Sequence, residues 1–352
     1  MYHQFFGLSE DPFKLTSDPS FLFLTAAHRQ VLAGVTYAIL NRKGFVVLSG
    51  DMGTGKTTLL NRIFQSIPAP RARFSVVLNP TLTPAEFLEL MLLDFGFSEV
   101  PSSKAQRLIM LKQFLVEAFR NNQVSALVVD EAHKLQPDVL EEIRLLGNIE
   151  LPEAKLLQVV LAGQTELASV LNRHDLRQLK QRIAVRLAVH PLSPNDVAHY
   201  IHYRWQKAGA TKAHPFESGA VARIVLCSGG VPRLVNVLCD NALRSAYGAG
   251  KETIGPSQII EVAKNLDLRL DVPKLPVEAL RPCASLQRRP PVAVNGDGKV
   301  ATEATSAPRS VGVLIDSEDS AVKPSGLKRL VAKFGVSPWS AHRNDWIPRI
   351  DS

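Results

Sequence analysis

Short runs of apolar residues alternate with longer segments of helical periodicity through the first half of the chain. The helical segments carry apolar residues at i, i+3 and i+4, as a helix with one buried face does. The apolar runs are rich in β-branched residues and almost continuous, which is typical of strands buried on both faces of a sheet. They cover residues 45–50, 74–79, 126–130, 156–163 and 184–190. The alternation predicts an α/β fold with a five-stranded parallel sheet and helices on both faces.

The strand pattern stops after the fifth apolar run, and only helical patterns follow. Four of them lie near 194–207, 216–227, 232–248 and 256–266. Pro194 and Pro256 stand at the start of the first and the last of these patterns, where proline commonly opens a helix. The sequence therefore predicts an α/β core domain over residues 41–192 and a small all-helical domain over residues 193–271.

The composition changes again at about residue 272, where proline, alanine, serine and glycine become frequent and no period persists. This texture predicts a disordered linker over residues 272–325. The tail at 326–352 contains one exception, the segment Gly326–Pro348, in which apolar and basic residues fall on opposite helical faces. That pattern is typical of a short basic helix for an anionic membrane surface or an acidic groove. The alternative is a floppy tail or one folded onto its own core, because two-turn helices are marginal in water.

The bulk composition limits the classes of protein that the chain can represent. The chain has 352 residues, of which 45% are hydrophobic, so it can bury a large core. Three cysteines are too few for a disulfide framework and fit a reducing compartment. No stretch approaches the ~20 apolar residues of a membrane-spanning helix, and we expect a cytoplasmic protein. The net charge of +8 is only a weak indication of an anionic partner, because charge by itself governs solubility and nonspecific association. The excess is spread along the chain, and residues 272–352 carry half of it (12 Lys+Arg against 8 Asp+Glu).

A glycine-rich loop follows the first predicted strand. Its sequence, GDMGTGKTT, matches the phosphate-binding pattern G-x-x-x-x-G-K-[ST] between a strand and a helix. In such a loop the glycines let successive N–H groups face the phosphates, Lys56 neutralises charge and Thr57 offers a hydroxyl to Mg²⁺. The residues that we expect to contact the nucleotide are Gly50, Asp51, Met52, Gly53, Thr54, Gly55, Lys56, Thr57 and Thr58. The sequence therefore predicts binding of ATP with Mg²⁺.

An acidic pair ends the third predicted strand, in the heptapeptide LVVDEAH at 127–133. Asp130 at the carboxyl edge of a neighbouring strand is expected to hold Mg²⁺ together with Thr57, and Glu131 to orient or deprotonate the attacking water. The letters DEAH also occur in a group of helicases, but a helicase needs a second α/β motor domain for which this chain has no room. His133 is therefore interpreted as incidental to catalysis, at most a link from the γ-phosphate site to the next helix.

A helical domain after a phosphate-loop domain resembles the AAA+ ATPases, in which the nucleotide lies between a core and a helical lid. The resemblance implies that Gln164, after the fourth strand, is the polar sensor of the γ-phosphate, and that Arg233 couples the lid to the nucleotide. It also implies an arginine finger that acts on the nucleotide of a neighbouring subunit, and hence a homo-oligomer. Arg177, Arg182 and Arg186 are the candidates for this finger, and Arg182 matches the family pattern best.

The chain is similar, more narrowly, to the ExeA-type (general secretion pathway protein A) branch of the AAA+ ATPases. The similarity rests on the N-terminal string MYHQFFGLSEDPF and on the segments GDMGTGKTT, VVDEAH, LAGQTEL, LKQRI and GGVPRLVN, in this order, and covers residues 1 to about 268. It implies that residues 1–40 comprise a family segment, lying along the core near the adenine, and the first core helix. His28 in this segment either helps to hold the base or caps that helix.

Members of this branch that serve secretion carry a membrane-spanning helix and a periplasmic domain after the ATPase core. This chain shows neither, so it resembles the shorter stand-alone members of the branch. We expect an ATPase that drives or regulates assembly of a secretion, pilus or export apparatus, with protein partners from that envelope system. Two alternatives remain open, a DNA-binding transposition helper and a nucleotide-gated scaffold with little turnover. DNA binding is less favoured because no DNA-reading module is recognisable.

Overall fold

The computed structural model describes residues 2–16, 18–68, 70–78 and 81–268, which fall in one compact unit. The predicted linker at 272–325 and the predicted tail helix at 326–352 lie outside the described residues. Within the described part, no helix combines the length and the apolar character that crossing a bilayer requires.

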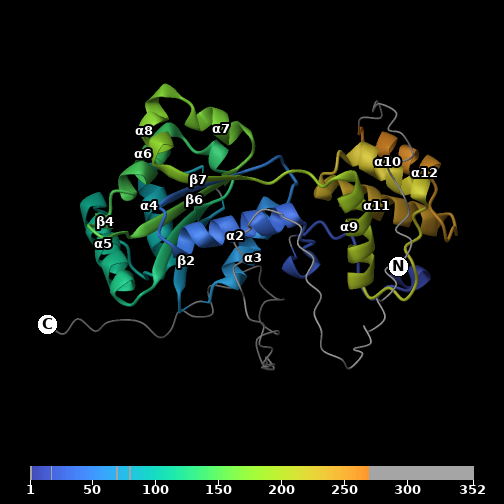
Figure 1. The fold of residues 1–352 in the computed structure, drawn as a ribbon, viewed down its shortest axis with the longest axis horizontal. Coiled ribbons are helices and arrows are strands. Elements are labelled where there is room, and N and C mark those ends of the chain that lie inside the picture. The colour runs from blue at the N-terminus through green and yellow to red at the C-terminus, as the bar shows by residue number, and fades with distance from the viewer. Residues whose placement is uncertain (1, 17, 69, 79–80, 269–352) are drawn as a thin grey trace, which may run out of the picture. The chain divides into compact units, whose positions relative to one another are not determined.

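Five parallel strands form the central sheet, in the order β2-β3-β6-β1-β7 (Figure 1). The strands are β1 (Phe45–Ser49), β2 (Ala72–Val77), β3 (Val124–Val129), β6 (Leu157–Gly163) and β7 (Ile183–Ala188). The predicted five-stranded parallel sheet is thus confirmed. Strand β7 departs from the expectation of burial on both faces, because Ala184, Arg186 and Ala188 are exposed. The reason is its place at the edge of the sheet, where it contacts α2 (Ala26–Leu40) through residues such as Leu187.

Helices cover both faces of the sheet, as the sequence predicts. Alternate strand residues such as Val47 and Val129 join one apolar cluster with the helices that follow β2 and β3, while α2 and α3 lie on the other face (Figure 1). The core helices are α3 (Lys56–Ser66), α4 (Pro84–Phe95), α5 (Lys104–Arg120), α6 (Pro137–Leu146), α7 (Glu166–Leu171) and α8 (Arg177–Arg182). A small hairpin of β4 (Glu150–Leu151) and β5 (Ala154–Lys155) precedes β6 and has no counterpart in the prediction. Strands of two residues are too short to show a period.

Four helices form the lid, in agreement with the four helical patterns. They are α9 (Pro194–Lys207), α10 (Ser218–Ser228), α11 (Pro232–Gly248) and α12 (Pro256–Asn265). Their apolar faces meet in a second cluster that contains Trp205, Leu238 and Ile259, each almost fully buried. Such a cluster gives the small helical domain a core of its own.

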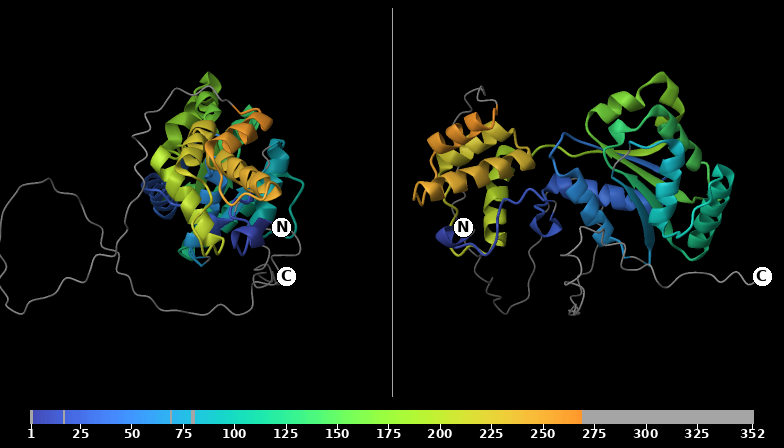
Figure 2. Two further views of the ribbon diagram at one scale, coloured as in Figure 1. Left: turned by 90° about the vertical axis from the view of Figure 1, so that its right-hand side faces the viewer. Right: turned by 180° about the vertical axis from the view of Figure 1, so that it is seen from behind.

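The described residues before α2, here called the strap (2–16 and 18–24), pack into the core of the lid. The strap includes the short helix α1 (Tyr2–Phe6), and its residues Phe6, Phe13 and Phe21 are buried in the lid cluster. Figure 2 shows this N-terminal segment beside the lid helices. The 3₁₀ helix Pro19–Phe21 of the strap also contacts the core helix α3, so the segment touches both domains. The sequence predicts the contact with the core and misses the packing against the lid. The aromatic side chains of the strap provide the apolar surface that four short helices alone would leave open.

A buried arginine on α9 fixes the strap to the lid by polar contacts. Arg204 Nε donates to Pro12 O at 2.5 Å, and its Nη1 donates to Tyr200 Oη at 2.9 Å. The guanidinium also lies over the ring of Phe21, 4.9 Å from its centroid. Tyr200 in turn donates to Asn236 Oδ1 on α11 at 2.8 Å. Arg204 thus joins the strap to α9, and Tyr200 extends the hydrogen bonding to α11.

Candidate nucleotide-binding site

The loop between β1 and α3 has a backbone that requires its glycines. Gly53 and Gly55 have φ angles of +80° and +97°, in the left-handed region that favours glycine. At Gly50 the reason is close approach, since a methyl group there would lie 2.4 Å from Val189 O. Gly55 is the N-cap of α3 and supplies no side-chain cap. The first N–H groups of the helix are therefore available to an anion.

Lys56 is buried at the foot of this loop, with 5% of its surface exposed. Its Nζ donates to Gly50 O at 2.7 Å and to Asp51 O at 3.0 Å. Burial lowers the pKa of Lys56, while the negative charges of Glu131 and Asp130 oppose this shift. The contacts of the ammonium group are carbonyl oxygens, which do not neutralise its charge. A phosphate group would supply that missing countercharge.

Thr57 and Asp130 meet at the carboxyl end of the sheet. Thr57 Oγ1 donates to Asp130 Oδ2 at 2.5 Å, and Asp130 Oδ1 accepts from the N–H of Glu131 at 2.9 Å. Asp130 is held at this edge because its own N–H donates to Val77 O on the neighbouring strand. A hydroxyl and a carboxylate are hard oxygen donors of the kind that Mg²⁺ prefers. The pair therefore fits the magnesium site that the sequence predicts.

Glu131 and Gln164 also meet at this edge, because β3 and β6 are neighbours in the sheet. Gln164 Nε2 lies 3.4 Å from Glu131 Oε2, within hydrogen-bonding distance. Glu131 has a left-handed backbone, with φ of +53°, which is uncommon for a residue with a side chain. The structure thus brings the predicted base and the predicted sensor into contact. It also brings in His133, whose Nε2 lies 3.6 Å from the same carboxylate oxygen.

A cavity of about 230 Å³ opens above the loop. Three parts of the chain line it, namely the glycine-rich loop with α3, the strap, and the lid helices α9 and α11. The lining residues include Gly53, Gly55, Lys56, Thr57, Thr58, Glu131, Phe23, His28, Tyr200, Arg204, Arg233 and Asn236. Of the predicted site, residues 52–58 of the glycine-rich loop, Glu131 and Arg233 line this cavity. The other predicted residues, Gly50, Asp51, Asp130 and Gln164, are not among the lining residues. Tyr200, Arg204 and Asn236 escape sequence analysis, because a polar residue within a helical pattern is usually on its exposed face.

The lid touches the phosphate loop directly through the first turn of α11. The N–H of Arg233 donates to Gly53 O at 3.3 Å. A methyl group at Gly53 would lie 2.8 Å from Arg233 Cβ and 3.1 Å from Val231 Cγ1. The Arg233 side chain is exposed at the rim of the cavity. The position of the lid is therefore coupled to the conformation of the loop by a backbone contact, independently of the Arg233 guanidinium.

Replacing Gly53 by alanine is expected to weaken nucleotide binding about tenfold. The added methyl group meets both an unfavourable left-handed backbone, which costs about 1–2 kcal/mol, and a steric clash with α11. Titration of a fluorescent ATP analogue measures the dissociation constant. Gly248→Ala is the matched control, because no atom lies within 4 Å of the methyl group at that position. Equal affinities of the two variants would contradict the proposed role of the Gly53 contact.

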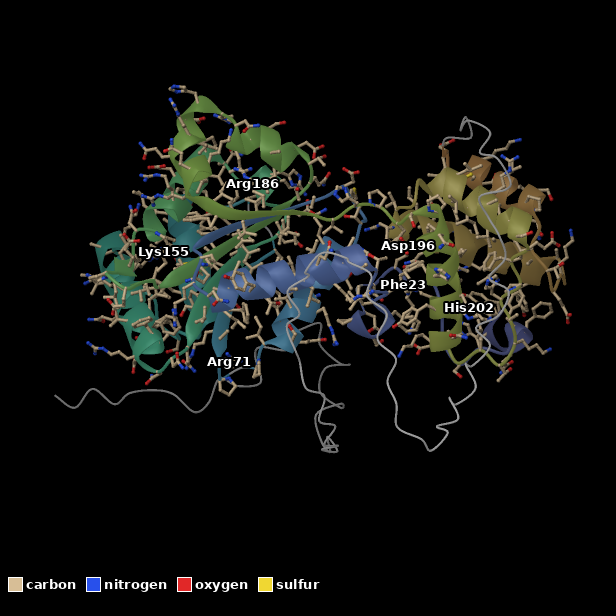
Figure 3. All side chains as sticks on the ribbon, in the orientation of Figure 1. Phe23, Arg71, Lys155, Arg186, Asp196 and His202 are labelled. Atoms are coloured by element: carbon tan, nitrogen blue, oxygen red, sulfur yellow. The ribbon has the colours of Figure 1, made fainter. Side chains whose placement is uncertain are left out.

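The three candidate finger arginines lie away from the cavity lining. Arg182 Nη1 donates to Arg144 O on α6 at 2.8 Å. Arg177 and Arg186 are exposed, and Figure 3 shows Arg186 on the core, on strand β7. None of the three is among the residues that line the cavity. The structure does not bring them to the nucleotide site of their own subunit.

His28 has the capping role that the sequence offers as one alternative. Its N–H donates to Thr25 Oγ1 at 3.1 Å, and its Nδ1 accepts from the N–H of Thr25 at 3.4 Å, which forms a capping box at the start of α2. Burial lowers the pKa of His28, so the ring is neutral near pH 7. The ring also borders the cavity beside Phe23, which Figure 3 labels on the strap.

The family model described as an AAA domain matches residues 39–171. General secretion pathway protein A of Aeromonas hydrophila is 40% identical over 258 residues, which cover 72% of this chain and 46% of that protein. The chain thus spans less than half the length of this relative. The ATP-dependent target DNA activator B of Escherichia phage Mu is 26% identical over 260 residues, which cover 71% of this chain and 75% of that protein.

Solved structures share the fold at low sequence identity. Cdc6p from Pyrobaculum aerophilum has a TM-score of 0.58 and 18% identity, and covers 73% of this chain and 71% of that one. The ORC2 protein of Aeropyrum pernix has a TM-score of 0.55 and 16% identity, with the same coverage. These similarities show the AAA+ fold, a phosphate-loop core followed by a helical domain.

Proposed function

Since the chain belongs to the ExeA-like (general secretion pathway protein A) family of AAA+ ATPases, we propose that it hydrolyses ATP to drive or regulate assembly of a bacterial secretion, pilus or export apparatus. One observation carries the enzymatic part of this proposal. Lys56, the Thr57–Asp130 pair and Glu131 converge on one edge of the sheet, beside the same loop. This set provides phosphate binding, metal binding and activation of water at a single place.

The proposed reaction assigns one task to each group. The N–H groups of the loop and Lys56 bind the β- and γ-phosphates. Thr57 and Asp130 hold Mg²⁺, which when bound neutralises charge on the phosphate oxygens. Glu131 orients the attacking water and accepts its proton, and Gln164 contacts the γ-phosphate or that water. Arg233 joins from the lid, so that closing of the lid completes the site.

We propose protein partners from the envelope assembly system and a cytoplasmic setting, because ATP and a reducing compartment suit the site and the cysteines. Peripheral membrane contact through residues 326–352 is part of the same hypothesis, and this tail lies outside the described residues.

The deciding measurement is the ATPase rate of the protein alone, with double-stranded DNA, and with vesicles that contain anionic phospholipids. Stimulation by vesicles or by an assembly component supports the proposal. Stimulation by DNA alone would contradict it.

DNA transposition is the second candidate function, and one observation favours it. The target DNA activator B of phage Mu aligns with this chain over three-quarters of its own length, 75%. Under this alternative the protein binds DNA in the presence of ATP, and the binding weakens as salt rises, because phosphate contacts release counterions. A third alternative, a scaffold with little turnover, predicts that the wild type hydrolyses ATP no faster than a variant without Glu131.

The proposed homo-oligomer gives a specific expectation for Arg182. Arg182→Ala is expected to bind ATP normally and to hydrolyse it at least about 100-fold more slowly, since a finger stabilises charge on the transferred phosphoryl group. Lys56→Ala is expected to lose phosphate binding. Mixing the two inactive variants should restore part of the activity, because one subunit supplies the finger and the other the nucleotide. Absence of recovery at every mixing ratio would argue against a finger in trans. Arg177→Ala and Arg186→Ala, measured in parallel, test the other two candidates.

A further inference from the structure

His133 lies between the two residues that are proposed to handle the attacking water. It belongs to the short 3₁₀ helix η2 (Ala132–Lys134), which begins directly after Glu131 and contacts β6. Its Nδ1 accepts a hydrogen bond from the backbone N–H of Gln164 at 3.4 Å. Its Nε2 lies 3.6 Å from Glu131 Oε2. The two ring nitrogens therefore face residues that follow two different strands, Gln164 after β6 and Glu131 after β3.

The contact with Gln164 fixes the protonation pattern of the neutral ring. A nitrogen that accepts from an N–H cannot carry a proton itself, so the neutral imidazole has its proton on Nε2. That nitrogen is the one that faces the Glu131 carboxylate. The backbone N–H of Gln164, directly after β6, thereby orients a donor towards the proposed base. The packing leaves little freedom, because a methyl group at Gly163 would lie 3.2 Å from the backbone nitrogen of His133.

Two other groups face the same carboxylate oxygen, and neither replaces the imidazole. Lys134 Nζ also lies 3.6 Å away, but its side chain is 56% exposed, against 13% for His133. Solvent screens an exposed ion pair and leaves the long side chain free to move. Gln164 Nε2 lies 3.4 Å away, yet under the proposed function this amide turns to the γ-phosphate or the attacking water. His133, whose side chain is largely shielded from solvent, is then the donor that stays beside Glu131.

We infer that His133 is a positioning residue for Glu131: through Nε2 it holds the carboxylate where it can accept a proton from water, and through Nδ1 it ties that position to the end of β6. The inference rests on the proposed function, because it assigns the proton-accepting role to Glu131. It assigns a role to a residue that is interpreted from the sequence as incidental to catalysis. The left-handed backbone of Glu131, with φ of +53°, gives a physical reason for such a support, since a strained residue keeps its geometry only when its neighbours hold it.

Three substitutions at this position separate the two ring contacts. His133→Ala removes both contacts. His133→Asn places Oδ1 where Nδ1 lies and keeps the contact with Gln164, whereas His133→Gln places Nε2 where the ring Nε2 lies and keeps the donor to Glu131. We expect kcat of His133→Ala to fall about 10- to 100-fold, as for other groups that orient a reacting residue, while KM for ATP changes less than about twofold. His133→Gln should keep more of the wild-type kcat than His133→Asn.

A double-mutant cycle with Glu131→Gln distinguishes positioning from a general structural effect. If His133 acts through Glu131, adding His133→Ala to Glu131→Gln causes little further loss of kcat. His174→Ala is the matched control, since His174 is exposed and outside the cavity lining. Wild-type kcat in His133→Ala, an equal kcat in His133→Asn and the wild type, or losses that multiply in the double variant would each overturn the inference.

The same measurements separate failure of this inference from failure of the proposed function. Normal turnover by His133→Ala beside an inactive Glu131→Gln overturns the inference alone. Wild-type turnover that is unaffected by Glu131→Gln overturns the proposed catalytic role of Glu131, and with it the support assigned to His133. If His133→Ala does not fold, the comparison of His133→Gln with His133→Asn decides the question, because each retains one polar contact.

Discussion

Glu131→Gln is expected to bind ATP with nearly wild-type affinity and to hydrolyse it at least about 100-fold more slowly, since general base catalysis contributes 10²- to 10⁴-fold. Glutamine has the shape of glutamate and can still face His133 and Gln164, but its amide cannot accept a proton from water. The hydrogen bonds that position Lys56 and Thr57, to Gly50 O and Asp130 Oδ2, do not involve this side chain and remain intact. The variant should therefore accumulate in the ATP-bound state.

Single-turnover hydrolysis and titration of a fluorescent ATP analogue measure the two quantities separately. Glu153→Gln is the matched control, because Glu153 is exposed in the loop between β4 and β5 and does not line the proposed nucleotide cavity. The control should retain the wild-type rate. A normal rate for Glu131→Gln would show that another group accepts the proton, and a large loss of ATP affinity would show that Glu131 contributes to binding rather than to chemistry.

Arg204→Met is expected to destabilise the protein by about 3 kcal/mol, because several buried acceptors lose their donor at once. Methionine fills much of the same apolar space, so the loss is mainly polar. Pro12 O loses its 2.5 Å contact and Tyr200 Oη its 2.9 Å contact. The cation–π contact with Phe21 also disappears. The strap should then detach from the lid at a lower free-energy cost than the unfolding of the four lid helices.

Denaturant unfolding gives the change in stability, and hydrogen exchange along residues 2–24 shows whether the strap is the part that is released. Arg223→Met is the matched control, since Arg223 is exposed on α10. Its stability should stay within about 0.5 kcal/mol of the wild type, as for most surface substitutions. Equal stabilities of the two variants, or unchanged protection of the strap in Arg204→Met, would contradict the role assigned to Arg204.

Local patterns in the sequence predict most of the fold and the loop of the site. The five apolar runs are parallel strands, and the four later helical patterns are the lid helices. The phosphate-binding loop at Gly50–Thr58 can be predicted because the features that define it are local. They are a left-handed backbone at Gly53 and a lysine at the start of a helix. Such features depend on residues that are neighbours in the sequence, so the sequence alone carries the signal.

Contacts between distant parts of the chain escape the same reasoning. Arg204 and Pro12 are 192 residues apart, and no period or motif relates them. Phe6 packs near Trp205, with ring centroids 6.1 Å apart. From the sequence alone, each of these two side chains could equally belong to a different hydrophobic core. The role of His133 depends on the approach of β6 to β3, which sequence patterns do not measure. A charged residue in an apolar helical pattern, or an aromatic residue outside the predicted helices and strands, can indicate that such a contact exists. It does not indicate which distant residue makes the contact.

The attachment of the strap to the lid has a mechanical consequence. Within the described residues, the chain passes between core and lid at two places, near Leu24, before α2, and near His190, after β7. On either side of the second place, the N–H of Val189 donates to Ser49 O in the core and that of Leu192 donates to Gly230 O in the lid. Two covalent connections restrict movement of the lid relative to the core to directions that both of them allow. Because the strap packs into the lid cluster, a movement of the lid would carry the strap with it, and the parts of the cavity that they line would shift together.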